Sequence, residues 1–228
     1  MINENKISRL AGLLYLIVVI TGLFSLVYVP SQITTGGNAQ AVVNHIVASK
    51  TLFRYGILSE LTQYAFMLFL LYPLYILLRP VNQNITWLMV VLVVVGMSIA
   101  FSAVSHKLDV LSLLSGNNLR HALATDQLNA QVMLSLAGYH NELLLSEIFW
   151  GLWLFPFGYL IFKSGFLPKI IGILLMIGCF SYLADFFSTF TGIAIPSFFM
   201  LPAAIGEICT CFWLLLVGTR YAKNSAAV

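Results

Sequence analysis

The sequence has very few charged residues. Asp, Glu, Lys and Arg make up 8% of its 228 residues, hydrophobic residues make up 60%, and the mean hydropathy is +0.95. Soluble domains carry roughly 25% charged and about 45–50% apolar residues. A chain of this composition has too little polar surface to cover a soluble globule. Its basic residues form no cluster, which excludes a nucleic-acid-binding protein.

Cysteine is also scarce. Cys179, Cys209 and Cys211 all lie in apolar stretches and are predicted to be buried thiols, not a disulfide framework. Cys209 and Cys211 are two residues apart, so on one helix they face different ways. The sequence therefore predicts no redox pair.

The N-terminal region lacks the features of a cleaved signal peptide. Its apolar run, residues 10–29, is longer than the roughly 7–15 residues of a signal h-region. The run ends in Tyr28, Val29, Pro30 and Ser31, which is a poor cleavage site. We expect a retained first helix.

Long hydrophobic runs are what the sequence has in abundance. A spanning helix needs about 20 apolar residues, and six stretches provide them. They cover about residues 10–29, 55–78, 85–114, 127–162, 170–189 and 197–219. The sequence therefore predicts an all-α fold, a single transmembrane domain over residues 1–228 built as a bundle of six transmembrane helices.

The first connection, residues 30–51, is longer than the others. Within it, apolar residues recur at helical spacing: Ala39, Val42, Val43, Ile46 and Val47. This pattern predicts a short amphipathic helix that lies on the outer membrane surface.

The distribution of Lys and Arg predicts the orientation. With a cytoplasmic N-terminus, the cytoplasmic segments hold Lys6, Arg9, Arg79, Lys163, Lys169, Arg220 and Lys223. The outer segments then hold Lys50, Arg54 and Arg120. Because cytoplasmic loops carry an excess of basic residues, both termini are predicted to be in the cytoplasm.

Acidic residues lie where a spanning helix normally has none. Six of the eight are within or beside the apolar stretches: Glu60, Asp109, Glu142, Glu147, Asp185 and Glu207. At about 1.5 Å per residue from the cytoplasmic helix ends, all six fall in the outer half of the membrane. Ionisable groups at this depth are costly and mark functional sites. The sequence predicts an outward-facing polar pocket above an apolar inner seal.

The ligand-binding residues of this pocket are predicted to be Glu60, Glu142, Glu147, Asp185 and Glu207, with Arg54 and Lys107 as basic residues nearer its rim. The four deepest acids cannot all stay ionised together in a low dielectric. Some are protonated, or bases reach them, or a cation binds there. The alternative for Glu147, Asp185 and Glu207 is a set of neutral acids hydrogen-bonded between helices. Pro202 and Gly206 could loosen the helix around Glu207 and open a cavity.

A second candidate is a divalent metal site. His106 and Asp109 are three residues apart and share a helix face, and His140 and Glu147 share a face of the next helix. His106, Asp109 and His140 could supply the three protein ligands of a catalytic zinc site, with Glu147 as general base. The alternative is an interfacial rim in which Lys107 extends to the lipid headgroups.

Three segments resemble a known family. They are residues 9–16 (RLAGLLYL), 147–159 (EIFWGLWLFPFGY) and 163–172 (KSGFLPKIIG). The chain resembles, over nearly its whole length, a bacterial polytopic membrane family known as domain of unknown function 4386. The resemblance implies a small multi-pass protein of the bacterial cytoplasmic (inner) membrane, and it implies no activity and no assigned site.

The sequence leaves three functions open. The excess of deep acids favours a protein in the lipid bilayer that binds a cation, a proton or a small cationic or amphipathic ligand, and so favours a binding protein over an enzyme. The histidines allow a metal-dependent intramembrane hydrolase that acts on a lipid. The third function is a structural or regulatory membrane partner whose acids hold helices together.

Overall fold

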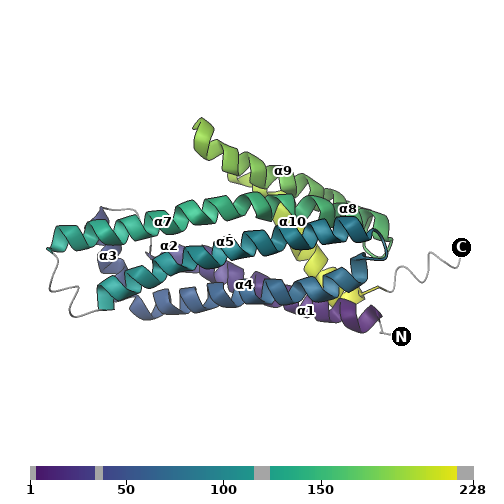
Figure 1. Cartoon of the computed structure of the whole chain (residues 1–228), viewed down its shortest axis with the longest axis horizontal. Helices are drawn as coiled ribbons and strands as arrows, with labels where there is room; N and C mark the ends of the chain where they lie inside the picture. The colour runs from purple at the N-terminus through teal and green to yellow at the C-terminus, as the bar shows by residue number, and fades with distance from the viewer. Residues whose placement is uncertain (1–3, 34–37, 116–123, 220–228) are drawn as a thin grey trace, which may run out of the picture. The chain divides into compact units, whose positions relative to one another are not determined.

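The computed structural model describes residues 4–33, 38–115 and 124–219, and their regular structure is entirely helical (Figure 1). Within these residues, six helical segments are long and apolar enough to cross a membrane. They are Glu4–Ile33, Lys50–Leu78, Gln83–Ser115, Thr125–Ser164, Lys169–Thr191 and Ser197–Val217. This confirms the predicted all-α bundle, and the chain is an integral membrane protein. The bacterial inner membrane and the cytoplasmic position of the termini stay predictions.

Several of the six segments are composed of more than one helix. The first contains α1 (Glu4–Gly22), the π-helix η1 (Leu23–Tyr28) and α2 (Val29–Ile33). Then follow α3 (Ala39–Ala48), α4 (Lys50–Leu78) and α5 (Gln83–Ser115). The fourth segment contains α7 (Thr125–Leu152) and α8 (Leu154–Ser164), and the fifth is α9 (Lys169–Thr191). The sixth contains the 3₁₀ turn η2 (Ser197–Met200), α10 (Leu201–Phe212) and the π-helix η3 (Trp213–Val217).

The first helix continues past the point at which the sequence predicted it to end. The predicted helix ended at Val29, the last residue of the apolar run. Pro30 lacks an N–H and crowds the preceding turn, yet the helix continues through it to Ile33. The structure has π-helical geometry just before the proline, where the Val29 N–H donates to the carbonyl of Phe24, five residues back. Such local widening accommodates proline within a membrane helix.

The predicted short helix exists as α3. Its N-terminus is capped by Asn38, whose side chain accepts a hydrogen bond of 3.0 Å from the Ala41 N–H. Val42, Val43 and Ile46 are buried on one face, as the spacing predicted, but Val47 is 42% exposed. The position of α3 on the outer membrane surface stays a prediction.

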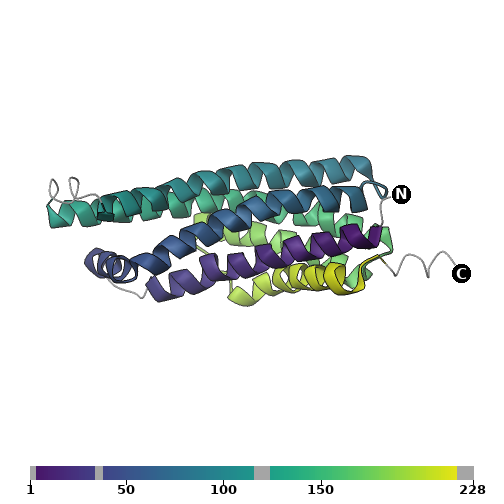
Figure 2. The same cartoon turned by 90° about the horizontal axis from the view of Figure 1, so that it is seen from below.

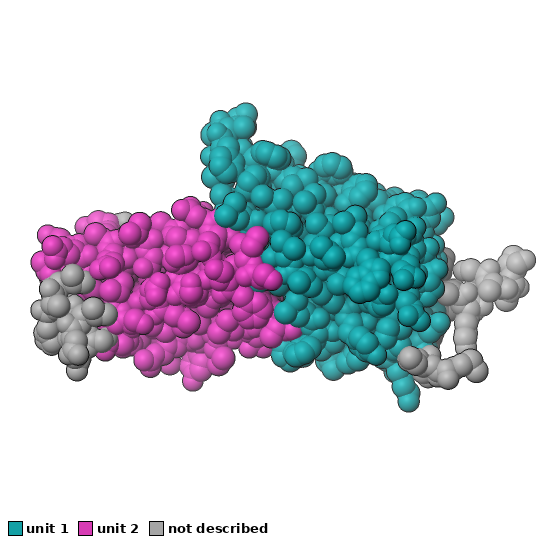
Figure 3. Space-filling model, viewed as in Figure 1, with its two compact units in different colours: residues 1–17, 66–97, 144–228 teal, residues 18–65, 98–143 magenta. Residues whose placement is uncertain are grey.

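The chain divides into two compact units, coloured separately in Figure 3. Unit 1 contains residues 1–17, 66–97 and 144–228, and unit 2 contains residues 18–65 and 98–143. The helices α1, α4, α5 and α7 contribute residues to both units. Each unit has its own set of helix contacts.

In unit 1, glycines allow close helix packing. A Cβ at Gly158 of α8 would lie 2.5 Å from the carbonyl oxygen of Gly172 in α9, so these backbones touch. The same α9 backbone packs on α10, where a Cβ at Gly178 would lie 2.7 Å from the Ala203 Cα. The first part of α1 runs beside α10 and η3 (Figure 2), and the Ser8 hydroxyl donates to the Leu214 carbonyl at 3.1 Å.

Unit 1 also shows which helix ends lie together. Glu4 near the start of α1, Arg79 after α4, Lys163 near the end of α8 and Thr219 after η3 all line one cavity. The first and last described residues of the chain are therefore at the same end of this unit. That both termini are on the cytoplasmic side of a membrane stays a prediction, and Arg220 and Lys223 lie outside the described residues.

In unit 2, polar side chains join the helices. The Ser59 hydroxyl of α4 donates to the Thr21 carbonyl of α1 at 3.0 Å, and Asn129 of α7 donates to the Gln40 side chain of α3 at 2.5 Å. Arg120, which was predicted in an outer loop, lies outside the described residues. The packing of α4, α5 and α7 in this unit positions the first group of predicted site residues.

Candidate functional site

The structure distributes the predicted site residues over both units. Unit 2 contains Arg54, Glu60, His106, Lys107, Asp109, His140 and Glu142, and unit 1 contains Glu147, Asp185 and Glu207. The two groups are therefore two separate candidate sites.

Glu60 is the centre of the polar network in unit 2. Its side chain is fully buried, and its Oε2 lies 2.6 Å from the Lys107 ammonium. Its Oε1 accepts hydrogen bonds from the hydroxyls of Tyr64 at 2.8 Å and Tyr139 at 2.7 Å. The Lys107 ammonium also lies 3.8 Å from the centroid of the Tyr139 ring. These four residues, the Glu60 network, connect α4, α5 and α7.

This network corrects the predicted position of Lys107. Lys107 was predicted to lie nearer the pocket rim, or to extend to lipid headgroups, but it is 9% exposed and paired with Glu60. Of the three alternatives left open for the deep acids, the one in which a base reaches the acid holds for Glu60. The sequence estimate took the depth of Lys107 from the position of its Cα. A Lys side chain is long enough to reach one turn along its own helix, so its ammonium can lie deeper in the membrane than its Cα.

The Glu60 network predicts the effect of Tyr139→Phe. The substitution removes one of two hydroxyl donors to a buried carboxylate and keeps the ring beneath the ammonium. We expect the free energy of unfolding to fall by about 0.5–1.5 kcal/mol. Thermal unfolding of the protein in detergent measures it. Tyr55→Phe on α4, where the tyrosine is 59% exposed, is the matched control and should change nothing. An equal midpoint for both variants would contradict the role of the hydroxyl.

His106 is next to Lys107 on α5 but faces a different acid. Its Nε2 lies 3.2 Å from Glu142 Oε1 on α7, and its Nδ1 lies 4.0 Å from Asp109. Gly138 of α7 packs directly on the ring, because a Cβ there would lie 2.8 Å from His106 Cε1. Glu142 Oε2 is buried without a hydrogen-bond partner. The His106–Glu142 pair therefore joins α5 to α7 beside the Glu60 network.

The predicted metal ligands are only partly together. His106 and Asp109 face one another, whereas His140 is an exposed residue of α7 and Asp109 is 64% exposed. Across residues 4–33, 38–115 and 124–219, no three His, Cys, Asp or Glu side chains are grouped to hold a metal ion. Arg54, the other predicted rim residue, is exposed on α4.

In unit 1, the three remaining acids lie around one tyrosine. Tyr182 of α9 is within electrostatic range of Glu147 of α7, Asp185 of α9 and Glu207 of α10. Glu147 and Asp185 are also close enough to repel each other. Glu207 accepts a hydrogen bond of 3.3 Å from the hydroxyl of Tyr15 in α1. We call Glu147, Asp185 and Glu207 the carboxylate cluster.

The packing of small residues positions the carboxylate cluster. A Cβ at Gly151 would lie 2.7 Å from the Tyr182 Cβ, so α7 and α9 meet one helical turn after Glu147. A Cβ at Gly206, next to Glu207, would lie 3.0 Å from Leu175 of α9. The prediction that Gly206 and Pro202 loosen the helix is wrong: Pro202 lies in the first turn of α10, and Gly206 brings α10 close to α9.

The burial of the acids differs from the prediction. Only Glu60 is fully buried, whereas Glu142, Glu147, Asp185 and Glu207 are half-buried and Asp109 is exposed. In the part of the chain that the structure describes, none of the three cluster carboxylates forms an ion pair. The carboxylate cluster is thus an accessible, uncompensated group of acids.

The sequence reasoning missed four tyrosines: Tyr15, Tyr64, Tyr139 and Tyr182. Tyr64 could have been found, because it lies four residues after Glu60 on the same helix face. Tyr182 likewise precedes Asp185 by three residues. Tyr15 and Tyr139 had no such signal, because only helix packing brings them to their acids.

Comparison with known proteins identifies one family. The profile described as "Domain of unknown function (DUF4386)" matches residues 10–218. An uncharacterized protein of Archaeoglobus fulgidus is similar, with 30% identity over 150 residues, which are 66% of this chain and 75% of the relative. No solved structure matches. The match extends across all six membrane segments, and the chain belongs to the family of domain of unknown function 4386.

Proposed function

We propose that this membrane protein binds a monovalent organic cation at the carboxylate cluster of unit 1. The observation that carries the proposal is the lack of a positive partner: among the described residues, Glu147, Asp185 and Glu207 form no ion pair. Glu147 and Asp185 are close enough to repel each other, and a bound cation removes that repulsion. Glu60 is not part of this site, because Lys107 already neutralises it.

Aromatic side chains favour an organic cation. Tyr182 lies among the three acids and Tyr15 contacts Glu207. Aromatic faces attract cations whose charge is spread over an apolar body, and carboxylates supply the charge pairing. The three acids are half-buried, so each side chain keeps some exposed surface. The competing occupants are a proton and an inorganic cation, and the titrations described below distinguish them from an organic cation.

The test is isothermal titration calorimetry of the full-length protein in detergent, with tetraphenylphosphonium as the probe. The Glu147→Gln/Glu207→Gln variant should bind at least about tenfold more weakly, because two charge pairings are lost. Asp109→Asn is the matched control, since it removes one exposed carboxylate of unit 2 and should keep the affinity.

Separate titrations with calcium chloride and sodium chloride complete the test. Unchanged tetraphenylphosphonium binding in the double variant would contradict the proposal. Binding of Ca²⁺ or Na⁺ in place of the organic cation, lost in the same variant, would reassign the site to an inorganic cation. Proton release by a protein that binds none of tetraphenylphosphonium, Ca²⁺ and Na⁺ would reassign the site to proton binding.

The Glu60 network supports a second role, that of holding helices together. Its carboxylate uses both oxygens on partners from α4, α5 and α7, so it has no free position for a ligand. We assign Glu60 and Lys107 to the structure of unit 2, and the ligand-binding proposal rests on unit 1 alone.

A further inference from the structure

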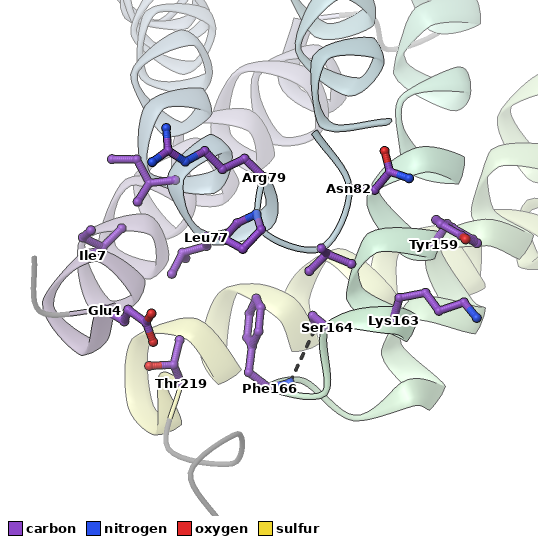
Figure 4. A pocket seen from close by; sticks show the side chains of 13 residues that line it. Glu4, Ile7, Leu77, Arg79, Asn82, Tyr159, Lys163, Ser164, Phe166 and Thr219 are labelled. Atoms are coloured by element: carbon purple, nitrogen blue, oxygen red, sulfur yellow. Dashed lines mark hydrogen bonds between the residues drawn. The ribbon is translucent and has the colours of Figure 1, made fainter. Parts of the chain in front are cut away.

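A cavity of about 780 Å³ opens at the end of unit 1 where α1 begins and α4 and α8 end. Its polar lining comes from four separate chain segments: Glu4, Arg79, Asn82, Tyr159, Lys163, Ser164 and Thr219. Figure 4 shows Glu4 and Thr219 on one side of the cavity and Asn82, Tyr159 and Lys163 on the other. The remaining lining is apolar and includes Ile7, Leu77 and Phe166. The cavity thus combines opposite charges with an apolar wall.

Aromatic residues place this cavity at the level of lipid headgroups. Tyr75 lies one turn before Arg79, and its ring packs 5.1 Å from that of Trp87 in the second turn of α5. Trp87 is half exposed, and Tyr72, one turn earlier in α4, is 68% exposed. Tyr and Trp with this exposure at helix ends form the interfacial belts of membrane proteins.

The cavity narrows toward the interior of unit 1. Leu77 and Phe166 also line a second cavity of only about 10 Å³, whose lining is apolar except for Thr210. A space of this size holds about one water molecule at most. The large cavity is therefore suited to holding a group at the membrane surface, and the small apolar space beneath it is too narrow to let that group pass.

The charges of the lining match a zwitterionic group. The charged ends of Arg79 and Lys163 point away from each other in Figure 4, but both side chains are exposed and can turn inward to offer charge-assisted hydrogen bonds to one phosphate. Asn82 uses its Oδ1 to cap α5, accepting from the Ile85 N–H at 3.1 Å, so its NH₂ group is the end left for an anion. Glu4 is the acid of this lining and would repel a phosphate but attract an ammonium group.

We propose that this cavity binds the headgroup of an amine-bearing phospholipid, with the phosphate at Arg79 and Lys163 and the ammonium at Glu4. The apolar wall then contacts the glycerol and the start of the acyl chains. Phosphatidylethanolamine has both charges and an ammonium that donates hydrogen bonds. Phosphatidylglycerol lacks the amine, and the choline of phosphatidylcholine has no N–H to donate.

Native mass spectrometry of the full-length protein in detergent tests this proposal. Phosphatidylethanolamine, phosphatidylglycerol, phosphatidylcholine and inorganic phosphate are added separately. The wild type should retain phosphatidylethanolamine best. Arg79→Gln/Lys163→Gln should weaken that binding by about tenfold or more, and Glu4→Gln should remove the preference over phosphatidylglycerol. Lys169→Gln is the matched control: this lysine lies over Phe162 at the same end and does not line the cavity.

Two results would overturn the proposal. One is equal retention of phosphatidylethanolamine by the wild type and the Arg79→Gln/Lys163→Gln variant. The other is displacement of the lipid by inorganic phosphate at equal concentration, which would assign the cavity to a free phosphate. Glu4, Arg79 and Lys163 are all exposed, so the variants should fold, and circular dichroism checks this.

Discussion

Lys107→Met is expected to lower the free energy of unfolding by about 3–5 kcal/mol, the cost of leaving a buried charge without its partner. Glu60 is fully buried, and Lys107 supplies its only positive charge among the described residues. Methionine keeps most of the volume of the lysine stem, so the loss reports the missing charge and not a cavity. The two tyrosine hydroxyls still donate to Glu60, but hydrogen bonds do not cancel its charge.

The measurement is equilibrium unfolding in mixed detergent micelles, followed by circular dichroism. Arg54→Met is the matched control, because Arg54 is an exposed base on α4 one to two turns before Glu60. It should leave the midpoint almost unchanged. The double variant Lys107→Met/Glu60→Gln should recover at least half of the loss, since a neutral amide can still accept from both tyrosines. No recovery in the double variant would show that the lysine contributes through packing and not through its charge.

The fold was predictable because length and hydropathy decide it. A run of about 20 apolar residues has one stable state in a bilayer, the helix, so all six segments were found. The missed boundaries have local causes. The first helix was predicted to end with the apolar run at Val29, but the π-helical turn at 23–28 carries the helix across Pro30. In α3, helical spacing predicted that Val47 lies on the apolar face with Val42, Val43 and Ile46, but Val47 is exposed.

The candidate site was predictable only in part. The sequence identified Glu147, Asp185 and Glu207 as unusual acids, and the structure gathers them around Tyr182. It did not predict that Lys107 neutralises Glu60, because that pair depends on side-chain length and on the approach of α4 to α5. The cavity of unit 1 had no signal in the sequence: basic residues at helix ends indicate orientation only, and four chain segments meet there through packing that no local pattern encodes.

Gly158→Ala should lower the free energy of unfolding by about 2–3 kcal/mol, although Ala is by itself the better helix former by about 1 kcal/mol. The new Cβ would lie 2.5 Å from the Gly172 carbonyl oxygen and 2.9 Å from the Met176 amide nitrogen. Both are backbone atoms of α9, so relief requires α8 and α9 to move apart.

Gly22→Ala makes the same change where its Cβ would meet Gln63 Nε2 at 2.8 Å. That atom ends a flexible side chain, which can move aside at the cost of a long hydrogen bond of 3.3 Å from the Ser25 hydroxyl, so the variant should lose far less stability than Gly158→Ala. Thermal unfolding of both variants separates the two cases. Because α9 also carries Tyr182 and Asp185, Gly158→Ala should weaken tetraphenylphosphonium binding as well, although it changes no residue of the carboxylate cluster. Equal stability of the two variants would contradict the direct contact of the α8 and α9 backbones.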